Sequence, residues 1–201
     1  MKDIKPYNPL DKTNLGESVA DAMLVSDVYS LGKLEPFNGA GIYAIYYVGD
    51  FEAYLPLAEQ NRFDKFEKPI YVGKAVSAGA RKGNFGLDTP PGRVLYKRLQ
   101  EHADSINLAK NLNLDDFYCR FLVVDDIWIP LGEALLIAKF SPIWNKHIDG
   151  FGNHDPGKGR YEQARSKWDT LHPGRTWALK CRQREDTPEQ ICLSILNWIE
   201  R

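Results

Sequence analysis

The stretch that decides the fold runs from residue 41 to residue 48 and reads GIYAIYYV. It is dense in β-branched and aromatic residues, which fit the pleated surface of a strand. Asn38-Gly39 precedes it and Gly49-Asp50 follows it, and such pairs are typical of turns. The stretch therefore predicts a strand bounded by a turn at each end.

Outward from this strand, the same reasoning predicts two more strands and four helices. The strands are residues 69–72 and residues 117–124, which read FYCRFLVV, and the helices are 15–29, 93–105, 131–140 and 188–200. Asn14 is the expected N-cap of the first helix, with Glu17 as its reciprocal partner. Strands and helices in this mixed order indicate a small α+β layer fold.

The segments between these elements are long. Residues 54–66 fit either a short helix or a long loop, while residues 75–92 and 149–160 are rich in glycine or proline and predict loops. The second of these loops reads DGFGNHDPGKGR. Because no internal repeat interrupts the pattern, residues 1–201 are expected to form a single domain.

Length and composition narrow the class of protein. The chain has 201 residues, a formal charge of −1 and 43% hydrophobic residues, which suits a globular domain and excludes a uniformly basic nucleic-acid coat or an acidic disordered tail. No apolar run approaches the roughly 18 residues of a membrane span. Residues 1–8 lack the apolar run of a signal peptide, so a cytoplasmic protein without a membrane partner is expected. Three widely spaced cysteines fit buried free thiols in a reducing compartment.

The balanced charge hides two basic segments. Residues 65–98 carry 8 basic and 2 acidic side chains, and residues 139–184 carry 10 and 4, whereas the other segments are acidic. Gathered lysines and arginines indicate a localised footprint for a polyanion. Two ordinary solvated surfaces are the alternative.

Several polar residues stand where the apolar pattern predicts a core. Glu133 lies early in the apolar helix 131–140, where a carboxylate must reach solvent, find a cation or bind a metal. An ordinary Glu favoured by the helix dipole is the alternative. Arg98 and His102 are four residues apart and share one helix face, which could bind a phosphate and handle a proton, or could simply be solvated.

Taken together, the motifs resemble the GIY-YIG nuclease superfamily. Five separated elements appear in its order: Gly41-Ile42-Tyr43, Tyr71-Val72-Gly73, Arg98, Glu133 and Asn145. Further similarity outside this core, from Trp144 through His172-Pro173-Gly174-Arg175 to Trp177-Ala178, resembles a group of GIY-YIG type II restriction endonucleases that cut a G/C-rich palindrome. The resemblance implies a core of three antiparallel strands flanked by helices. To this core the chain would add an N-terminal helix, insertions near residues 50–68 and 75–92, and a C-terminal extension over 146–201.

The resemblance also implies roles for these residues. Glu133 would hold one divalent metal, for which Mg²⁺ suits a hard oxygen ligand, and Arg98 would bind the scissile phosphate. Tyr43 would orient or deprotonate the attacking water, helped by His102 or Lys74 through a lowered phenol pKa. Tyr71 would share that network and could itself be the base, and Asn145 would orient Glu133 or a water. Many relatives have a tyrosine in place of His102, so the proton-handling role there can differ.

The expected partner is double-stranded DNA, bound by a homodimer if the target is palindromic, with a cognate DNA methyltransferase in the cell. Apart from Lys74, the candidate DNA contacts in the basic segments are Arg81, Lys82, Arg93, Lys158, Arg160, Arg165 and Lys167. Each could instead be a solubility charge. Two other functions remain open: a GIY-YIG repair or homing nuclease, and a DNA-binding protein that has lost catalysis. The chain lacks the cysteine pairs of the zinc elements that such nucleases often append.

Overall fold

The computed structural model describes residue 8 and residues 10–77 and 90–199 of the chain. Its centre is one antiparallel sheet with the strand order β1-β4-β2-β3. The strands are β1 (Tyr29–Ser30), β2 (Gly41–Tyr47), β3 (Tyr71–Ala75) and β4 (Phe117–Val123). The α+β class is therefore confirmed, whereas the expectation of three strands is wrong by one short strand.

The fourth strand, β1, lies where a helix was predicted. Helix α1 (Lys12–Val25) ends four residues before Tyr29, which pairs with Cys119 of β4. Its N-cap is Asp11, whose side chain accepts a hydrogen bond from the backbone N–H of Thr13, and not Asn14. A strand of two residues shows no alternation of polar and apolar positions, so sequence periodicity does not separate it from a helix end.

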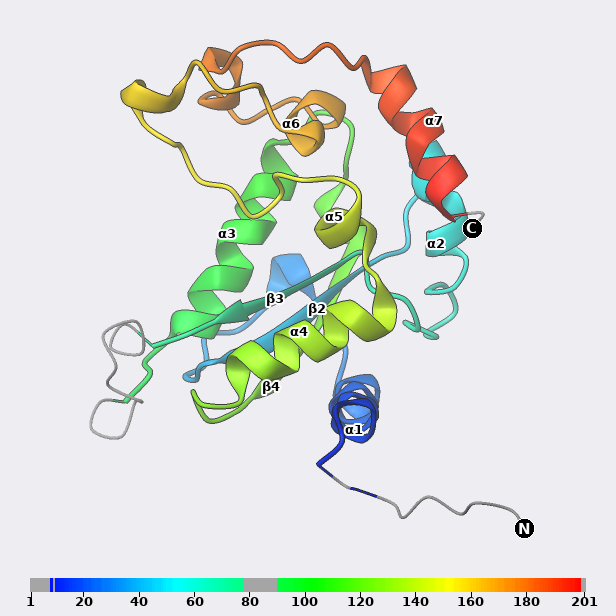
Figure 1. Ribbon diagram of the computed structural model, residues 1–201, viewed down its shortest axis with the longest axis vertical. Coiled ribbons are helices and arrows are strands. Elements are labelled where there is room, and N and C mark those ends of the chain that lie inside the picture. The colour runs from blue at the N-terminus through cyan, green and yellow to red at the C-terminus, as the bar shows by residue number, and fades with distance from the viewer. Residues whose placement is uncertain (1–7, 9, 78–89, 200–201) are drawn as a thin grey trace.

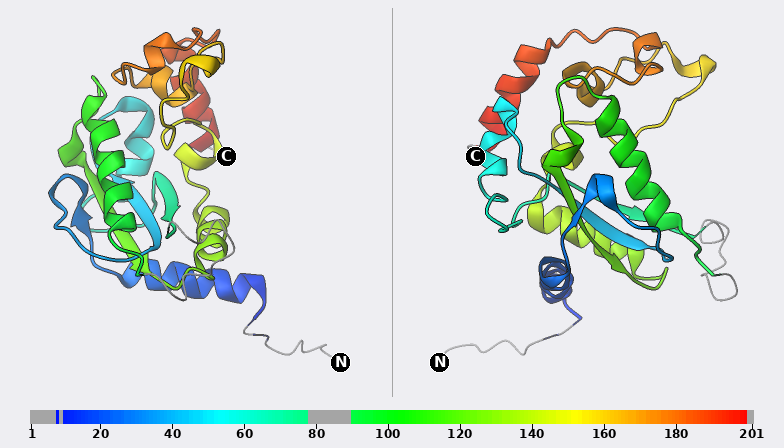
Figure 2. Two further views of the ribbon diagram at one scale, coloured as in Figure 1. Left: turned by 90° about the vertical axis from the view of Figure 1, so that its left-hand side faces the viewer. Right: turned by 180° about the vertical axis from the view of Figure 1, so that it is seen from behind.

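The two faces of the sheet are covered by different helices (Figures 1 and 2). All seven residues of β2 are buried because the strand is central and packed on both sides. Ile42, Ala44 and Tyr46 pack in the cluster that includes residues of α1 and α4 (Ile129–Phe140). Tyr43 and its alternate neighbours face the larger, aromatic cluster that includes residues of α3 (Val94–Leu108).

The remaining helices are short, except the last. They are α2 (Leu55–Ala58), α5 (Ile143–Lys146), α6 (Lys167–Leu171) and α7 (Pro188–Ile199), with 3₁₀ turns at Leu31–Lys33, Glu52–Tyr54, Leu114–Asp116, Lys158–Arg160 and Ala178–Lys180. The segment 54–66 thus forms a short helix followed by turns. Helix α7 lies beside α2 at one side of the molecule (Figure 1).

Other boundaries differ modestly from the sequence pattern. The strand predicted at 69–72 begins at Tyr71 and continues to Ala75, so the whole YVGKA run is extended and pairs with β2. Most of the predicted loop 75–92 lies outside the described residues. None of the described helices combines the length and the apolar character needed to cross a membrane.

Candidate active site

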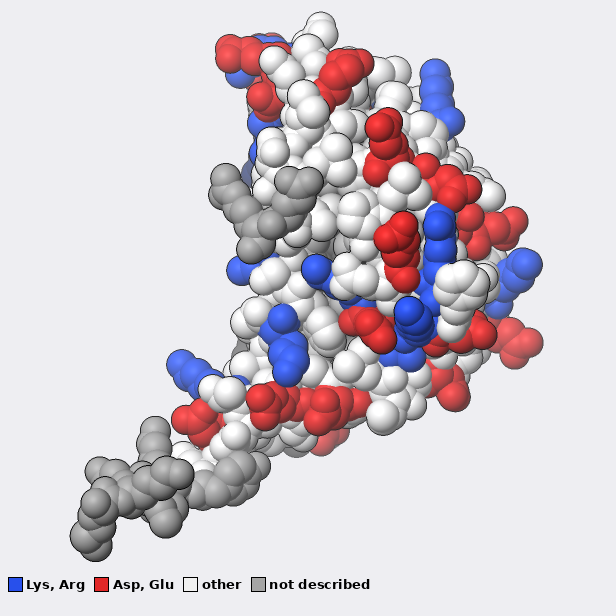
Figure 3. Space-filling model, turned by 90° about the vertical axis from the view of Figure 1, so that its right-hand side faces the viewer, with Lys and Arg blue, Asp and Glu red and all other residues white. Residues whose placement is uncertain are grey.

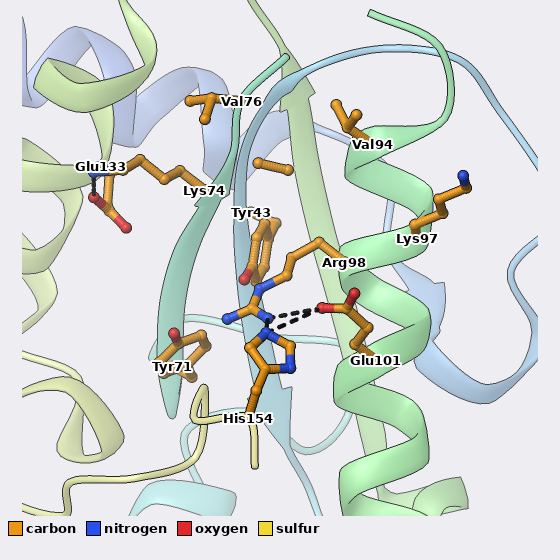
Figure 4. Close-up of a pocket in the computed structure, with 11 residues that line it drawn as sticks. Tyr43, Tyr71, Lys74, Val76, Val94, Lys97, Arg98, Glu101, Glu133 and His154 are labelled. Carbon is orange, nitrogen blue, oxygen red and sulfur yellow. Dashed lines mark hydrogen bonds and ion pairs between the residues drawn. The ribbon is translucent and has the colours of Figure 1, made fainter. Parts of the chain in front are cut away.

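A cavity of about 560 Å³ opens beside β3, the edge strand of the sheet. It receives side chains from β2, β3, α3, α4 and the loop after α5 (Figure 4). Its lining residues are Tyr43, Tyr71, Lys74, Ala75, Val76, Val94, Lys97, Arg98, Glu101, Glu133 and His154. The structure therefore brings together four of the residues given catalytic roles and Lys74, although they span 91 positions from Tyr43 to Glu133.

At two positions of the motifs, neighbouring atoms approach the backbone so closely that only glycine fits. A Cβ at Gly41 would overlap the backbone carbonyl of Leu122 in the neighbouring strand β4. A Cβ at Gly73 would overlap the hydroxyl of Tyr43, which lies over the backbone of β3. The glycine on β3 therefore makes room for the tyrosine hydroxyl carried by β2.

The Tyr43 hydroxyl lies 2.6 Å from Nε2 of His102, and both side chains are buried. Burial raises the pKa of Tyr43 well above its ordinary value, and the nearby Tyr71 adds to the rise while Arg98 opposes it. Burial also lowers the pKa of His102 well below its usual range, with a smaller contribution from Arg98. His102 is therefore neutral near pH 7. The expectation of a lowered pKa for the Tyr43 phenol is wrong: its pKa is raised, because desolvation exceeds the effect of Arg98.

Tyr71 has its ring 6.3 Å from that of Tyr43 and 5.2 Å from that of His102, measured between centroids. Burial raises the pKa of its hydroxyl, and Arg98 opposes this rise. Both tyrosines are therefore protonated phenols near pH 7.

Arg98 extends from α3 between the two tyrosines (Figure 4). Its Nη1 donates to Glu101 Oε2 at 2.8 Å and to His154 Nε2 at 2.9 Å, and its Nη2 donates to the carbonyl of Gly152 at 3.1 Å. The sequence assigned no role to Glu101 or His154. The spacing of three residues between Arg98 and Glu101 could have predicted their ion pair, because residues three apart on a helix are neighbours. The contact of His154 with Arg98 depends on how the loop after α5 folds.

Glu133 extends from α4 and pairs with Lys74 of β3, with 2.5 Å between Oε2 and Nζ. The sequence left three outcomes for this carboxylate, namely contact with solvent, with a cation or with a metal. The structure shows pairing with a cation, Lys74. The pair lines the cavity with 20% of the Glu133 side chain and 38% of the Lys74 side chain exposed. No group of three or more His, Cys, Asp or Glu side chains suited to a metal occurs among the residues that the structure describes. Glu101 also lines the cavity but pairs with Arg98, which leaves Glu133 as the carboxylate suited to a metal. One such carboxylate fits Mg²⁺, which keeps several of its waters and binds proteins through one or two carboxylates together with substrate phosphate.

The Asn145 side chain bonds the backbone of β3. Its Oδ1 accepts from the backbone N–H of Val72 at 2.8 Å and its Nδ2 donates to the Val72 carbonyl at 2.7 Å. Because β3 is an edge strand, these backbone groups point away from β2 and need partners. The amide therefore supplies hydrogen bonds to the outer side of β3, and its expected role in orienting Glu133 or a water stays a prediction.

Five of the candidate DNA contacts are described by the structure and are not among the residues that line the cavity. Arg93, Lys158 and Arg160 are exposed, whereas Arg165 and Lys167 are half-buried. The Arg165 Nε donates to the carbonyl of Ala178, and Lys167 Nζ to that of His147. The other two, Arg81 and Lys82, lie outside the described residues. The cations that the structure places in the cavity are Lys74, Lys97 and Arg98.

A central strand that carries GIY, an edge strand that carries YVG, and a helix that directs an arginine toward both tyrosines define a GIY-YIG nuclease domain. The family model described as the Eco29kI GIY-YIG domain matches residues 35–199, and the chain belongs to this family of GIY-YIG type II restriction endonucleases. The family resemblance of the sequence is thereby confirmed. No individual curated protein matches the chain.

Proposed function

We propose that the chain is a Mg²⁺-dependent type II restriction endonuclease that cuts double-stranded DNA at a specific, palindromic, G/C-rich site. The observation that carries this proposal is the convergence of Tyr43, Arg98 and Glu133 on one cavity in a chain of this nuclease family. Hydrolysis needs an attacking water, stabilisation of phosphate charge and assistance to the leaving oxygen. The cavity offers a residue for each of the first two needs.

Arg98 is the residue proposed to bind the scissile phosphate. Its planar guanidinium can donate two parallel hydrogen bonds to phosphate oxygens and can stabilise charge that develops on them. It faces the cavity with 22% of its side chain exposed, and Glu101 and His154 hold one of its nitrogens. The neighbouring Lys97 adds positive charge at the same wall.

Tyr43 is proposed to take the proton of the attacking water while passing its own proton to His102. Because the pKa of the phenol is raised, Tyr43 is not a free phenolate near pH 7. No free phenolate is required if the two proton transfers are coupled through the 2.6 Å contact with His102. The neutral His102 supplies the acceptor nitrogen. Tyr71 belongs to the same cluster and is the alternative base.

Glu133 is proposed to hold the single Mg²⁺, with Lys74 adjacent. A divalent ion bound there supplies charge stabilisation to phosphate and leaving oxygen. Lys74 pairs with the carboxylate and offsets its charge. Asn145 has a positioning role, because it fixes the backbone of the strand that carries both Tyr71 and Lys74.

DNA would be bound by a homodimer whose two-fold axis matches the palindrome, and a cognate methyltransferase would protect the host. The protein would act in the cytoplasm. On the side that carries α2 and α7, acidic and basic side chains are intermixed (Figure 3), which suits a surface turned away from DNA. Because lysines and arginines neutralise phosphates, affinity should fall steeply with salt, and an affinity independent of salt would contradict the phosphate contacts.

Incubation of the purified protein with plasmid and Mg²⁺ tests the proposal. Discrete fragments whose mapped ends share one sequence would support restriction. A preference for branched substrates would support a repair nuclease instead, and intact plasmid under these conditions would leave only DNA binding.

A further inference from the structure

Arg175 is a buried arginine that is not among the residues lining the cavity. Only 3% of the residue is exposed, and its guanidinium lies 4.5 Å from the ring centroid of Trp168 and 4.8 Å from that of Trp177. A buried cation needs a counter-charge and hydrogen-bond acceptors, or it destabilises the fold. The carbonyl groups that accept from this guanidinium lie in one loop.

Three carbonyls of the loop after α5 accept from Arg175. Its Nη2 donates to Gly150 at 2.8 Å, and its Nη1 donates to Phe151 and to Asn153 at 3.0 Å each. Its Nε donates to Asp169 Oδ1 at 2.7 Å, which supplies the counter-charge. Because several carbonyls converge on one planar group, the guanidinium fixes the path of residues 149–154.

The same loop contacts three residues of the candidate active site. The Phe151 ring stacks on His102, with 4.5 Å between centroids and 17° between planes, and meets Tyr71 edge-on at 4.9 Å. The carbonyl of Gly152 accepts from Arg98 Nη2 at 3.1 Å. His154 Nε2 accepts from Arg98 Nη1 at 2.9 Å, since an arginine can only donate. The orientation of Arg98, His102 and Tyr71 therefore depends on this loop.

The backbone just before Arg175 is fixed to the end of the helix that carries Arg98 and His102. The N–H of Lys110, just beyond the end of α3, donates to the carbonyl of Pro173 at 3.0 Å. At Gly174, a Cβ would overlap the carbonyl of Leu108, so the backbone approaches this helix end as closely as it can. Helix, Arg175 and loop thus form a closed set of contacts around the site.

We propose that Arg175 is a positioning residue for DNA cleavage, which sets the orientation of Arg98, His102 and Tyr71 through residues 149–154 without touching the substrate. Arg175→Lys keeps the charge but cannot hold three carbonyls and a carboxylate. Small displacements of catalytic groups cost large factors in rate, so the single-turnover cleavage constant should fall roughly 10- to 100-fold. The Kd for DNA should change by less than about threefold, because the substrate contacts remain.

A double-mutant cycle separates positioning from general loss of stability. Gly152→Ala perturbs the same loop from the other side, because its Cβ would lie 2.9 Å from the Tyr71 hydroxyl and 3.1 Å from Arg98 Nη2. If both changes act through the loop, the double variant should cleave no more slowly than the slower single variant. Multiplied losses, or parental cleavage by Arg175→Lys, would overturn the proposal. Arg184→Lys, whose partner Asp186 is exposed, is the matched control and should cleave at the parental rate.

A second readout does not depend on cleavage, which matters because the kinetic test rests on the proposed function. The NMR resonances of the Arg98 Nε–H group and the His102 ring should shift in Arg175→Lys, and unchanged resonances would overturn the proposal. If the parent protein failed to cut DNA, the proposed function would fall while these resonances would still test the positioning. Should Arg175→Lys not fold, Asp169→Asn replaces it in both tests, since it removes the counter-charge and keeps the shape.

Discussion

Acidification should destabilise the protein through its two buried histidines. His172 donates through Nδ1 to Asn111 Oδ1 at 3.0 Å, so its neutral ring accepts the Tyr54 hydroxyl at Nε2, 2.8 Å away. Burial lowers the pKa of His172 to about 3 and lowers that of His102 well below its ordinary value. The His172 ring therefore stays neutral in the folded state at pH 5, and the lowered pKa of His102 acts in the same direction.

The sign and size follow from proton linkage. An unfolded histidine has a pKa near 6.5, so below that pH the unfolded chain binds protons that the folded state does not, and folding stability falls as the pH falls. The slope is about 1.36 kcal/mol per pH unit for each histidine. Between pH 7.5 and pH 5.0 the buried His172 ring should cost about 2 kcal/mol of unfolding free energy, and His102 should add to this loss.

Urea unfolding at pH 7.5, 6.5 and 5.0 measures this loss. His172→Gln should remove about 2 kcal/mol of this loss, and His102→Gln should also reduce the pH dependence, whatever they do to the stability at pH 7.5. The difference between parent and variant isolates one histidine from other groups that titrate in this range. Equal stability of the parent at pH 7.5 and 5.0, or a full loss in both variants, would refute the reasoning.

Three further substitutions test separate parts of the site. Tyr43→Phe leaves the buried Nε2 of His102 without its partner and should reduce the unfolding free energy by about 1–3 kcal/mol. It should also reduce the single-turnover cleavage rate by roughly 10²- to 10⁴-fold. Cleavage at the parental rate would make Tyr71 the better candidate for the base. Lys74→Met removes the ammonium that pairs with Glu133 and would compete with the proposed metal, so calorimetry should show up to about fivefold tighter binding of Mg²⁺ or Mn²⁺ to the free protein, and weaker binding would contradict the competition. Gly41→Ala forces a Cβ against the backbone of β4 and should cost about 1–3 kcal/mol in urea unfolding, whereas Gly159→Ala, with nothing within 4 Å of its Cβ, is the neutral control.

Much of the fold follows from patterns that are local in sequence. The β-branched and aromatic runs of β2 and β4 and the apolar spacing of α3 were sufficient to place those elements within a few residues. The two-residue strand β1 was missed because its pairing with β4, and not its own composition, makes it a strand.

The candidate site was predictable only where a motif specified the residue. Tyr43, Arg98 and Glu133 stand in the order of a known motif set, so their convergence could be expected. The contact between His154 and Arg98 could not, because it depends on the path of a loop held by a buried arginine 21 residues further along the chain. Asn145 adds a contact that the motif did not indicate: both groups of its amide bond the backbone of Val72 at the edge of β3.

The most direct test of the central claim is the cleavage of plasmid DNA by Glu133→Gln in the presence of Mg²⁺. The amide keeps the shape of the side chain but loses the charge that holds a hard cation. We expect single-turnover cleavage at least roughly 100-fold slower than that of the parent, with DNA binding retained, because a bound metal supplies several kcal/mol of stabilisation. Glu185→Gln, at an exposed position, should cleave like the parent. Full cleavage by Glu133→Gln would contradict the assignment of the metal to this carboxylate and, with it, the proposed catalytic site.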